Sequence, residues 1–180
     1  MLRAGSAWAG VIVVGARCVE IRRLGVGDVA DYRTIRHAAL EEAPEAFGAV
    51  YEDEVARSVE DDAERLAICV VFGAYAEGKI VGMAGFKREA GRKNCHKAFV
   101  WGLYVRPEAR RRGAAALLIE TLIACAAAEF EQLILTVVKG NDGAIALYEK
   151  FGFETYGVEP KALKSSAGYA DEVLMVRFLK

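Results

Sequence analysis

The sequence lacks the cysteine spacing that marks a structural zinc site or a redox motif. No two of its four cysteines stand in a CxxC pair, and zinc ribbons and thiol oxidoreductases depend on such close pairs. We therefore expect no metal site, and we expect reduced, mostly buried thiols in a cytoplasmic protein. The four cysteines are Cys18, Cys69, Cys95 and Cys125.

The chain also lacks an excess of charge of either sign. Its formal net charge is -1, with 27% charged and 54% hydrophobic residues, which is a globular balance. This balance excludes a general electrostatic attraction to nucleic acid, so we expect no nucleic-acid partner. Any anion that the protein binds must be held by a local arrangement of groups.

No apolar run is long enough to cross a bilayer as a helix, which takes about 20 apolar residues. Residues 1–17 have the weak outline of a signal peptide, but Arg17 directly before Cys18 spoils a cleavage site. We predict that residues 1–17 form a leader or an extra strand outside the core. Residues 18–180 are predicted to form one domain without a membrane partner, since 180 residues suit a single domain.

The first half of the chain predicts strands and helices in alternation. Residues 19–24 alternate as a half-buried strand does, and Asp28 is a plausible cap for the helix that follows and that Pro44 interrupts. Ser58 is suited to cap a second helix, with acidic residues in its first turn. The predicted elements that follow are a helix over residues 59–66 and a hairpin of strands over residues 68–76 and 79–87.

The second half predicts a strand, a long alanine-rich helix and a further strand, helix and strand, with no internal repeat or linker. The predicted ranges are 98–105, 111–130, 133–138, 142–151 and 172–179. This order predicts a single α/β layer structure, with a mixed, mostly antiparallel central sheet and helices on both faces.

An arginine-rich turn directly before the long helix predicts an anion site. The first N–H groups of a helix have no helical acceptors, the helix dipole adds partial positive charge there, and Gly113 lets a phosphate approach the backbone. Small side chains at Ala114 and Ala115 leave room for a pyrophosphate. Arginines at a helix start oppose the dipole, so Arg110, Arg111 and Arg112 favour a bound anion over a plain surface run.

Two motifs in this sequence resemble those of the GNAT superfamily of N-acetyltransferases. Residues 110–115, Arg-Arg-Arg-Gly-Ala-Ala, are similar to its acyl-CoA motif Q/R-x-x-G-x-G/A, and residues 102–107 precede them as a family-like strand. Residues 141–153 are similar to a second pattern, N-x-x-A-x-x-L-Y-x-x-x-G-F. The resemblance covers nearly everything from Cys18 to Lys180 and implies acetyl transfer from acetyl-CoA to a primary amine, by direct attack on the thioester and without a metal.

The resemblance also implies roles for particular residues. The backbone of Leu103, Tyr104 and Val105 pairs with the pantetheine arm, residues 110–115 hold the pyrophosphate, and Asn141 contacts the cofactor. Tyr148 also contacts the cofactor and protonates the departing thiolate as the general acid. The alternative for Tyr148, beside Leu147 and Phe151 on a helix, is an aromatic core residue. The cofactor-binding residues so implied are Leu103, Tyr104, Val105, Arg110, Arg111, Arg112, Gly113, Ala114, Ala115, Asn141 and Tyr148.

The general base cannot be assigned from the sequence. An amine with a pKa of about 10.4 must lose a proton before it attacks a thioester, yet residues 98–103 lack the carboxylate that several members of the family carry there. The conceivable bases are Glu45, Glu52, His37, His96 and Glu172.

The acceptor is equally open. The segment 42–48 is expected to form part of the acceptor wall, with carboxylates that suit an ammonium, or else a solvated turn. The basic loop 87–93 either touches a substrate or the remaining phosphate of the cofactor, or is a solvated hairpin end. The acceptor is a small amine, a peptide N-terminus or a protein lysine, and a homodimer stays open.

Four rival functions are weaker or unresolved. Residues 73–79 match the start of a P-loop, but Ile80 stands where a hydroxyl must reach magnesium, and the segment continues as a strand. Residues 25–30 match a relaxed dinucleotide fingerprint without the acidic partner it needs about 20 residues later. A non-catalytic module that binds acyl-CoA, and an enzyme that transfers a longer acyl group, both stay open.

Overall fold

The computed structural model describes residues 9–12 and 19–180. Within them, one sheet of eight strands runs in the order β1-β2-β3-β4-β5-β6-β8-β7. Only the β5–β6 pair is parallel. The strands are β1 (Ala9–Ile12), β2 (Val19–Leu24), β3 (Val70–Ala76), β4 (Lys79–Arg88), β5 (Lys97–Val105), β6 (Gln132–Val138), β7 (Glu154–Ser165) and β8 (Gly168–Phe178).

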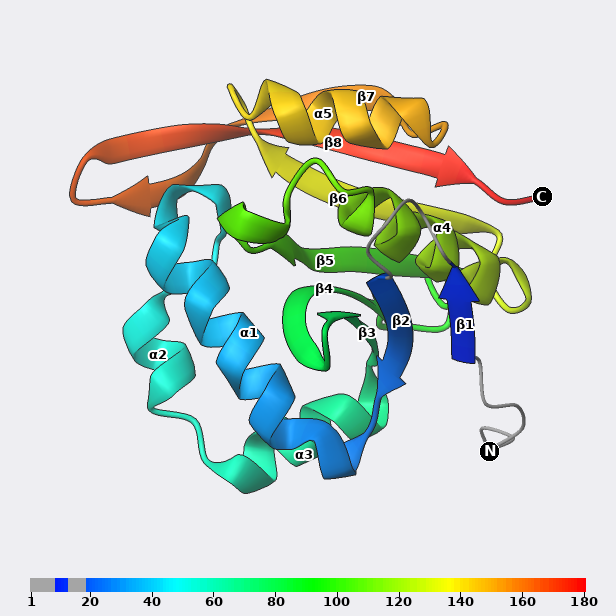
Figure 1. Cartoon of the computed structure of the whole chain (residues 1–180). Helices are drawn as coiled ribbons and strands as arrows, with labels where there is room; N and C mark the ends of the chain where they lie inside the picture. The colour runs from blue at the N-terminus through cyan, green and yellow to red at the C-terminus, as the bar shows by residue number, and fades with distance from the viewer. Residues whose placement is uncertain (1–8, 13–18) are drawn as a thin grey trace.

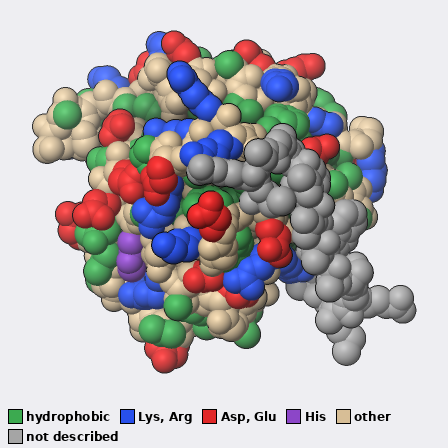
Figure 2. Space-filling model, in the orientation of Figure 1, with side chains coloured by type: hydrophobic (Ala, Val, Ile, Leu, Met, Phe, Trp, Pro, Cys, Tyr) green, Lys and Arg blue, Asp and Glu red, His purple; other side chains and the backbone are tan. Residues whose placement is uncertain are grey.

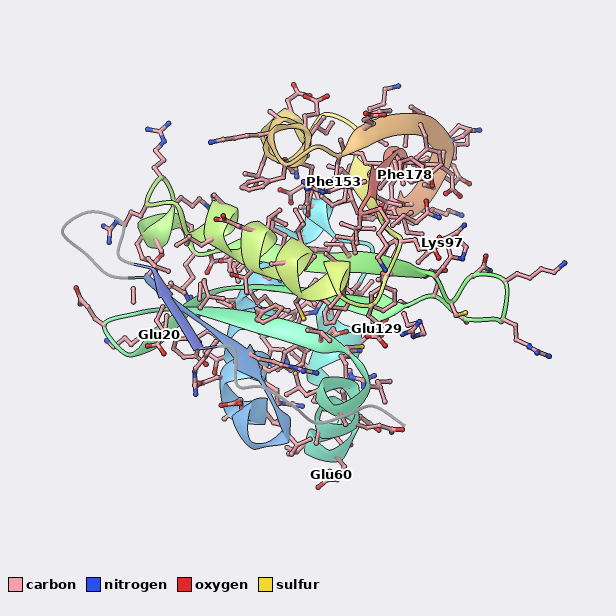
Figure 3. All side chains as sticks on the ribbon, turned by 90° about the vertical axis from the view of Figure 1, so that its right-hand side faces the viewer. Glu20, Glu60, Lys97, Glu129, Phe153 and Phe178 are labelled. Atoms are coloured by element: carbon pink, nitrogen blue, oxygen red, sulfur yellow. The ribbon has the colours of Figure 1, made fainter. Side chains whose placement is uncertain are left out.

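Helices cover both faces of the sheet, as predicted (Figures 1 and 3). Their bounds are α1 (Val29–Glu42), α2 (Tyr51–Val55), α3 (Val59–Ile68), α4 (Ala114–Ala127) and α5 (Asp142–Lys150), with 3-10 turns η1 (Val26–Asp28), η2 (Pro44–Ala46) and η3 (Pro107–Ala109). The two hydrophobic clusters show how alternation divides the strands between the faces. Phe72 of β3 packs on the α4 side with Leu118, whereas its neighbour Val71 packs on the α1 side with Ile35.

The leader prediction concerns residues that lie mostly outside the described part of the chain. Residues 1–8 and 13–18, with Cys18, are among these. Residues 9–12 form β1, which pairs antiparallel with β2. Along the described ranges, no helix combines the length and the apolar character that a membrane span needs.

The sequence predicted most elements and missed two. Strand β2, helix α3 and the β3–β4 hairpin lie within one or two residues of their predicted bounds. Helix α2 and strand β7 were not predicted, and Asp28 does not cap α1 as expected. It stands at the capping position, but its carboxylate accepts a hydrogen bond from the Gly25 amide at 2.8 Å.

The long helix begins later than the sequence predicts. Its first residue is Ala114 rather than Arg111, and it ends at Ala127 rather than Phe130. Arg111 has φ +61 and Gly113 has φ +82, and neither angle fits a right-handed helix. The arginines therefore form a turn before the helix instead of its first residues.

Buried ion pairs tie α1, α2 and α3 together. Glu54 of α2 accepts hydrogen bonds from Arg65 at 2.7 Å and from Arg36 at 3.3 Å. Burial alone would raise the pKa of Glu54, but the two guanidinium groups outweigh it and lower the pKa. Separating the helices would leave the buried Glu54 carboxylate without a partner, which is costly. The ion pairs therefore hold α2 against α1 and α3.

Helix α3 is capped by Ser58, as predicted, and the cap is a reciprocal capping box. The Ser58 hydroxyl accepts a hydrogen bond from the Asp61 amide at 3.0 Å, and the Asp61 carboxylate accepts one from the Ser58 amide at 3.1 Å. We expect Ser58→Ala to lower the free energy of unfolding by about 1 kcal/mol, because one amide loses its acceptor. Urea denaturation measures this. Ser166→Ala, at an exposed turn position, is the control, and an equal loss in both variants would contradict the cap.

Candidate functional site

The cleft begins where the sheet splits. Strands β5 and β6 pair only over Lys97–Phe99 and Gln132–Ile134, although β5 continues to Val105 and β6 to Val138. The second half of β5 therefore has a partner, β4, on one side only. Its free edge offers backbone N–H and C=O groups to an added extended chain.

A cleft of about 1370 Å³ lies at this split. One wall is the end of β5 with the start of α4, and the second is the end of β6 with the start of α5. The remaining wall combines residues 40–52 with the β7–β8 hairpin. The loop after α1 and the β7–β8 hairpin are in contact, because a Cβ atom on Gly48 would lie 3.3 Å from the Leu163 side chain. Figure 1 shows the end of the hairpin beside this loop.

The arginine-rich turn leaves an open space at the start of α4. Gly113 has φ +82, a conformation that favours glycine, and a Cβ atom there would meet nothing within 4 Å. The first helical hydrogen bond is donated by the Leu117 amide to the Gly113 carbonyl at 3.0 Å. The preceding helix amides, at residues 114–116, lack helical acceptors, and the left-handed turn before them adds to an anion-binding concavity.

The residues of the predicted phosphate motif do not all face the cleft. Arg110 lines it, with its Nε donating to the Val105 carbonyl at 2.9 Å, and Ala115 lines it too. Arg111 and Arg112 are exposed just before the helix, and Ala114 is buried beneath it. On the face in Figure 2, basic and acidic side chains are interspersed rather than separated by sign.

The three residues predicted to contact pantetheine, Leu103, Tyr104 and Val105, all line the cleft. They follow Gly102, which has φ +70, and the register with β4 shifts between Met83 and Gly85 opposite this glycine. This β-bulge bends the strand at the split and turns its end toward the cleft.

The opposite wall carries the second predicted motif. Asn141 lines the cleft, and its side-chain oxygen caps α5 by accepting from the Ala144 amide at 3.3 Å. Tyr148 is not among the lining residues. It is only 6% exposed and packs edge-on against Phe153. Burial raises the pKa of Tyr148 above its ordinary value, so its hydroxyl stays protonated at neutral pH.

The five candidate bases lie in different places. Glu45 and Glu52 line the cleft. His37 stacks edge-on against Tyr51, His96 contacts the Gln132 amide at 3.2 Å, and Glu172 accepts from the Thr136 hydroxyl at 2.9 Å. None of these last three is a lining residue, so the structure brings only the two glutamates to the cleft.

Of the segment 42–48, which was predicted as part of an acceptor wall, all residues except Glu42 line the cleft, whereas residues 87–93 do not line it. Residues 87 and 88 end β4, and residues 89–93 lie in the loop before β5, at the end of that strand away from the cleft. In the described ranges no three acidic, histidine or cysteine side chains form a group suited to a metal ion, and Cys69, Cys95 and Cys125 are free.

Sequence reasoning missed two parts of the site. The β7–β8 hairpin contributes residues 162–165 and 167–170 to the cleft. The Tyr104 hydroxyl donates a hydrogen bond to Glu42 at 2.5 Å, over a separation of 62 residues. No pattern in the sequence points to this pair, because only the tertiary fold brings the two residues together.

Known proteins match this arrangement. The model of the acetyltransferase (GNAT) family matches residues 32–153. An acetyltransferase of the GNAT family from Streptococcus pneumoniae has a similar structure, with a TM-score of 0.80 and 22% identity over 90% of this chain and 99% of that one. No curated protein sequence matches the chain significantly.

Two further solved structures are similar. A ribosomal-protein-alanine N-acetyltransferase from Brucella melitensis has a TM-score of 0.76 and 24% identity, over 88% of this chain and 98% of that one. A phosphinothricin acetyltransferase from Sinorhizobium meliloti, in complex with AcCoA, has a TM-score of 0.74 and 23% identity, over 89% of this chain and 88% of that one. At these identities the likeness shows a shared fold.

Proposed function

This chain belongs to the acetyltransferase (GNAT) family, and from that premise we propose that it transfers an acetyl group from acetyl-CoA to a primary amine. The open cradle at Gly113, at the start of the helix whose Ala115 lines the cleft, is the observation that carries the proposal. The space beside Gly113 is empty, since a Cβ atom there would meet nothing within 4 Å, so a pyrophosphate has room to approach the backbone. The amides at the start of α4 lack helical acceptors and are free to donate to it.

The donor occupies the split in the sheet. The pantetheine arm adds to the free edge of β5 at Leu103, Tyr104 and Val105, as an extended chain adds to any open strand. The pyrophosphate lies on the turn of residues 110–115, where Arg110 supplies a charge at the cleft wall. Asn141 faces the donor from the start of α5. Structural relatives bound to acetyl-CoA support this choice of donor.

The acceptor enters from the wall formed by residues 40–52. Glu41, Glu45 and Glu52 line that wall, and their carboxylates form no ion pair with another residue of the described ranges. Free carboxylates beside the thioester position favour a cationic group, so they support an amine as the acceptor.

Transfer proceeds by direct attack. The amine, once deprotonated, forms a bond with the acetyl carbonyl carbon, and the carbon–sulfur bond breaks as the thiolate leaves. The nitrogen then loses a second proton to solvent, which leaves a neutral amide. The Tyr148 hydroxyl, which is protonated at neutral pH, donates its proton to the thiolate as it leaves and afterwards regains one from solvent. This role requires the buried Tyr148 hydroxyl to contact the sulfur atom of the bound donor.

A panel of amines tests the proposal. We expect thiol release from acetyl-CoA with at least one class among polyamines, aminated small molecules, peptides with free N-termini and peptides with a free lysine. Calorimetry measures acetyl-CoA affinity in parallel. Tight binding without thiol release across the whole panel would instead support a non-catalytic acyl-CoA-binding module, and faster turnover with longer acyl-CoA donors would change the acyl group.

A further inference from the structure

The contact between Glu42 and Tyr104 joins two elements at the edge of the cleft. Glu42 is the last residue of α1, and Tyr104 lies near the end of β5, where Figure 1 shows the two ends close to each other. The Tyr104 hydroxyl donates to Glu42 Oε2 at 2.5 Å, and Arg106 approaches the other carboxylate oxygen at 3.5 Å.

The pair connects the interior of the cleft with solvent. Tyr104 lines the cleft and is 5% exposed, so its hydroxyl is shielded from water by the surrounding protein. The Glu42 side chain is 33% exposed and does not line the cleft. A proton on Glu42 can therefore pass to water. A proton on the Tyr104 hydroxyl can leave only by moving to Glu42 along the hydrogen bond between them.

We propose that Tyr104 and Glu42 form the proton relay that deprotonates the acceptor ammonium, a role that rests on the proposed acetyl transfer. An ammonium N–H bond breaks and its proton moves to the Tyr104 oxygen. The phenol proton moves at the same time along the existing hydrogen bond to Glu42 Oε2. The nitrogen keeps the electron pair and attacks the thioester carbonyl, and neutral Glu42 then releases its proton to water.

The chemistry of the pair favours a relay over a phenolate base. Burial and the Glu42 carboxylate both raise the pKa of Tyr104, so the phenol holds its proton until another one arrives. The charges of Arg106 and Arg110 act on Tyr104 in the opposite direction and lower its pKa, but burial and Glu42 outweigh them. On α1, Glu41 is the other titratable group at this end and lines the cleft beside the pair.

The arrangement also separates Glu42 from the other carboxylates of the wall. The Glu45 and Glu52 side chains make no hydrogen bond with a described residue that would fix their position, and neither is linked to a polar group on β5. A hydrogen bond already formed in the resting protein needs no reorganisation when the proton moves. Tyr104 is thus the group that touches the amine, and Glu42 is a positioning residue that acts through it.

Kinetics of Tyr104→Phe, Glu42→Gln and the double variant test the relay, with Glu64→Gln, at an exposed position of α3 outside the cleft lining, as the control. With an amine that the wild type acetylates, we expect about a 100-fold loss of kcat/KM for the amine near pH 7 in each relay variant. Acetyl-CoA affinity is expected to stay unchanged. The double variant should lose no more than either single one, because the two residues act as a unit.

The pH profile separates a relay from a structural contact. Toward the amine pKa of about 10.4 the free amine forms without help, so the deficit of the relay variants should shrink as pH rises. A deficit that is constant with pH, additive losses, or an equal loss in Glu64→Gln would overturn the relay. Full activity of the relay variants would do the same. Absence of wild-type turnover with every amine would instead overturn the proposed function.

Discussion

Replacing Gly113 with valine is expected to lower acetyl-CoA affinity by about 100-fold or more. The open space beside Gly113 would receive two methyl groups where the pyrophosphate is proposed to approach the helix amides. Loss of one or two charge-assisted hydrogen bonds, each contributing about 1.5–3 kcal/mol, gives a change of this size. Calorimetric titration with acetyl-CoA measures it.

A strained backbone is the competing explanation, and Gly91→Val controls for it. Gly91 also has a left-handed φ, +92, and a Cβ atom there would meet only the Asn94 side chain at 4.0 Å. It lies in the loop before β5, at the end of that strand away from the cleft. We expect the two variants to lose similar stability on thermal unfolding, while only Gly113→Val loses affinity. Unchanged affinity in Gly113→Val would remove the cradle from the donor site.

Local patterns predicted those parts of the fold that local forces determine. The β3–β4 hairpin follows from two apolar runs around Glu77 and Gly78, and both of these residues adopt positive φ. Helix α3 follows from its cap at Ser58. By contrast, the residues of β7 are almost all exposed, so they show no alternation of buried and exposed positions and gave no strand signal.

The site was predicted in the same uneven way. Gly113 and Asn141 lie in short motifs whose chemistry depends on neighbours in the sequence. Asn141 lines the cleft, and Gly113 precedes α4 between the lining residues Arg110 and Ala115 in the sequence. The start of α4 was predicted too early because arginine has a high helix propensity, and propensity does not reveal the left-handed turn at Arg111. Glu42 was predicted only as part of the acceptor wall, and its hydrogen bond with Tyr104 gave no signal because the two residues are distant along the chain.

Tyr148→Phe is expected to lower kcat by about 100-fold or more, while acetyl-CoA affinity stays nearly intact. The phenyl ring preserves the edge-on contact with Phe153, so folding should change little. Only the hydroxyl proton is lost, and the leaving thiolate then departs without an acid. The rate of thiol release at saturating acetyl-CoA and amine measures the change in kcat, and calorimetry measures the acetyl-CoA affinity.

The pH dependence distinguishes the acid from the relay on the other side of the cleft. Because burial raises the pKa of Tyr148, the wild type keeps this proton well above neutral pH, and the acid is not lost as pH rises toward 9. The deficit of Tyr148→Phe should therefore persist over that range, whereas the deficit of Tyr104→Phe should shrink. If Tyr148→Phe turns over like the wild type, Tyr148 is an aromatic core residue and the thiolate takes its proton from elsewhere.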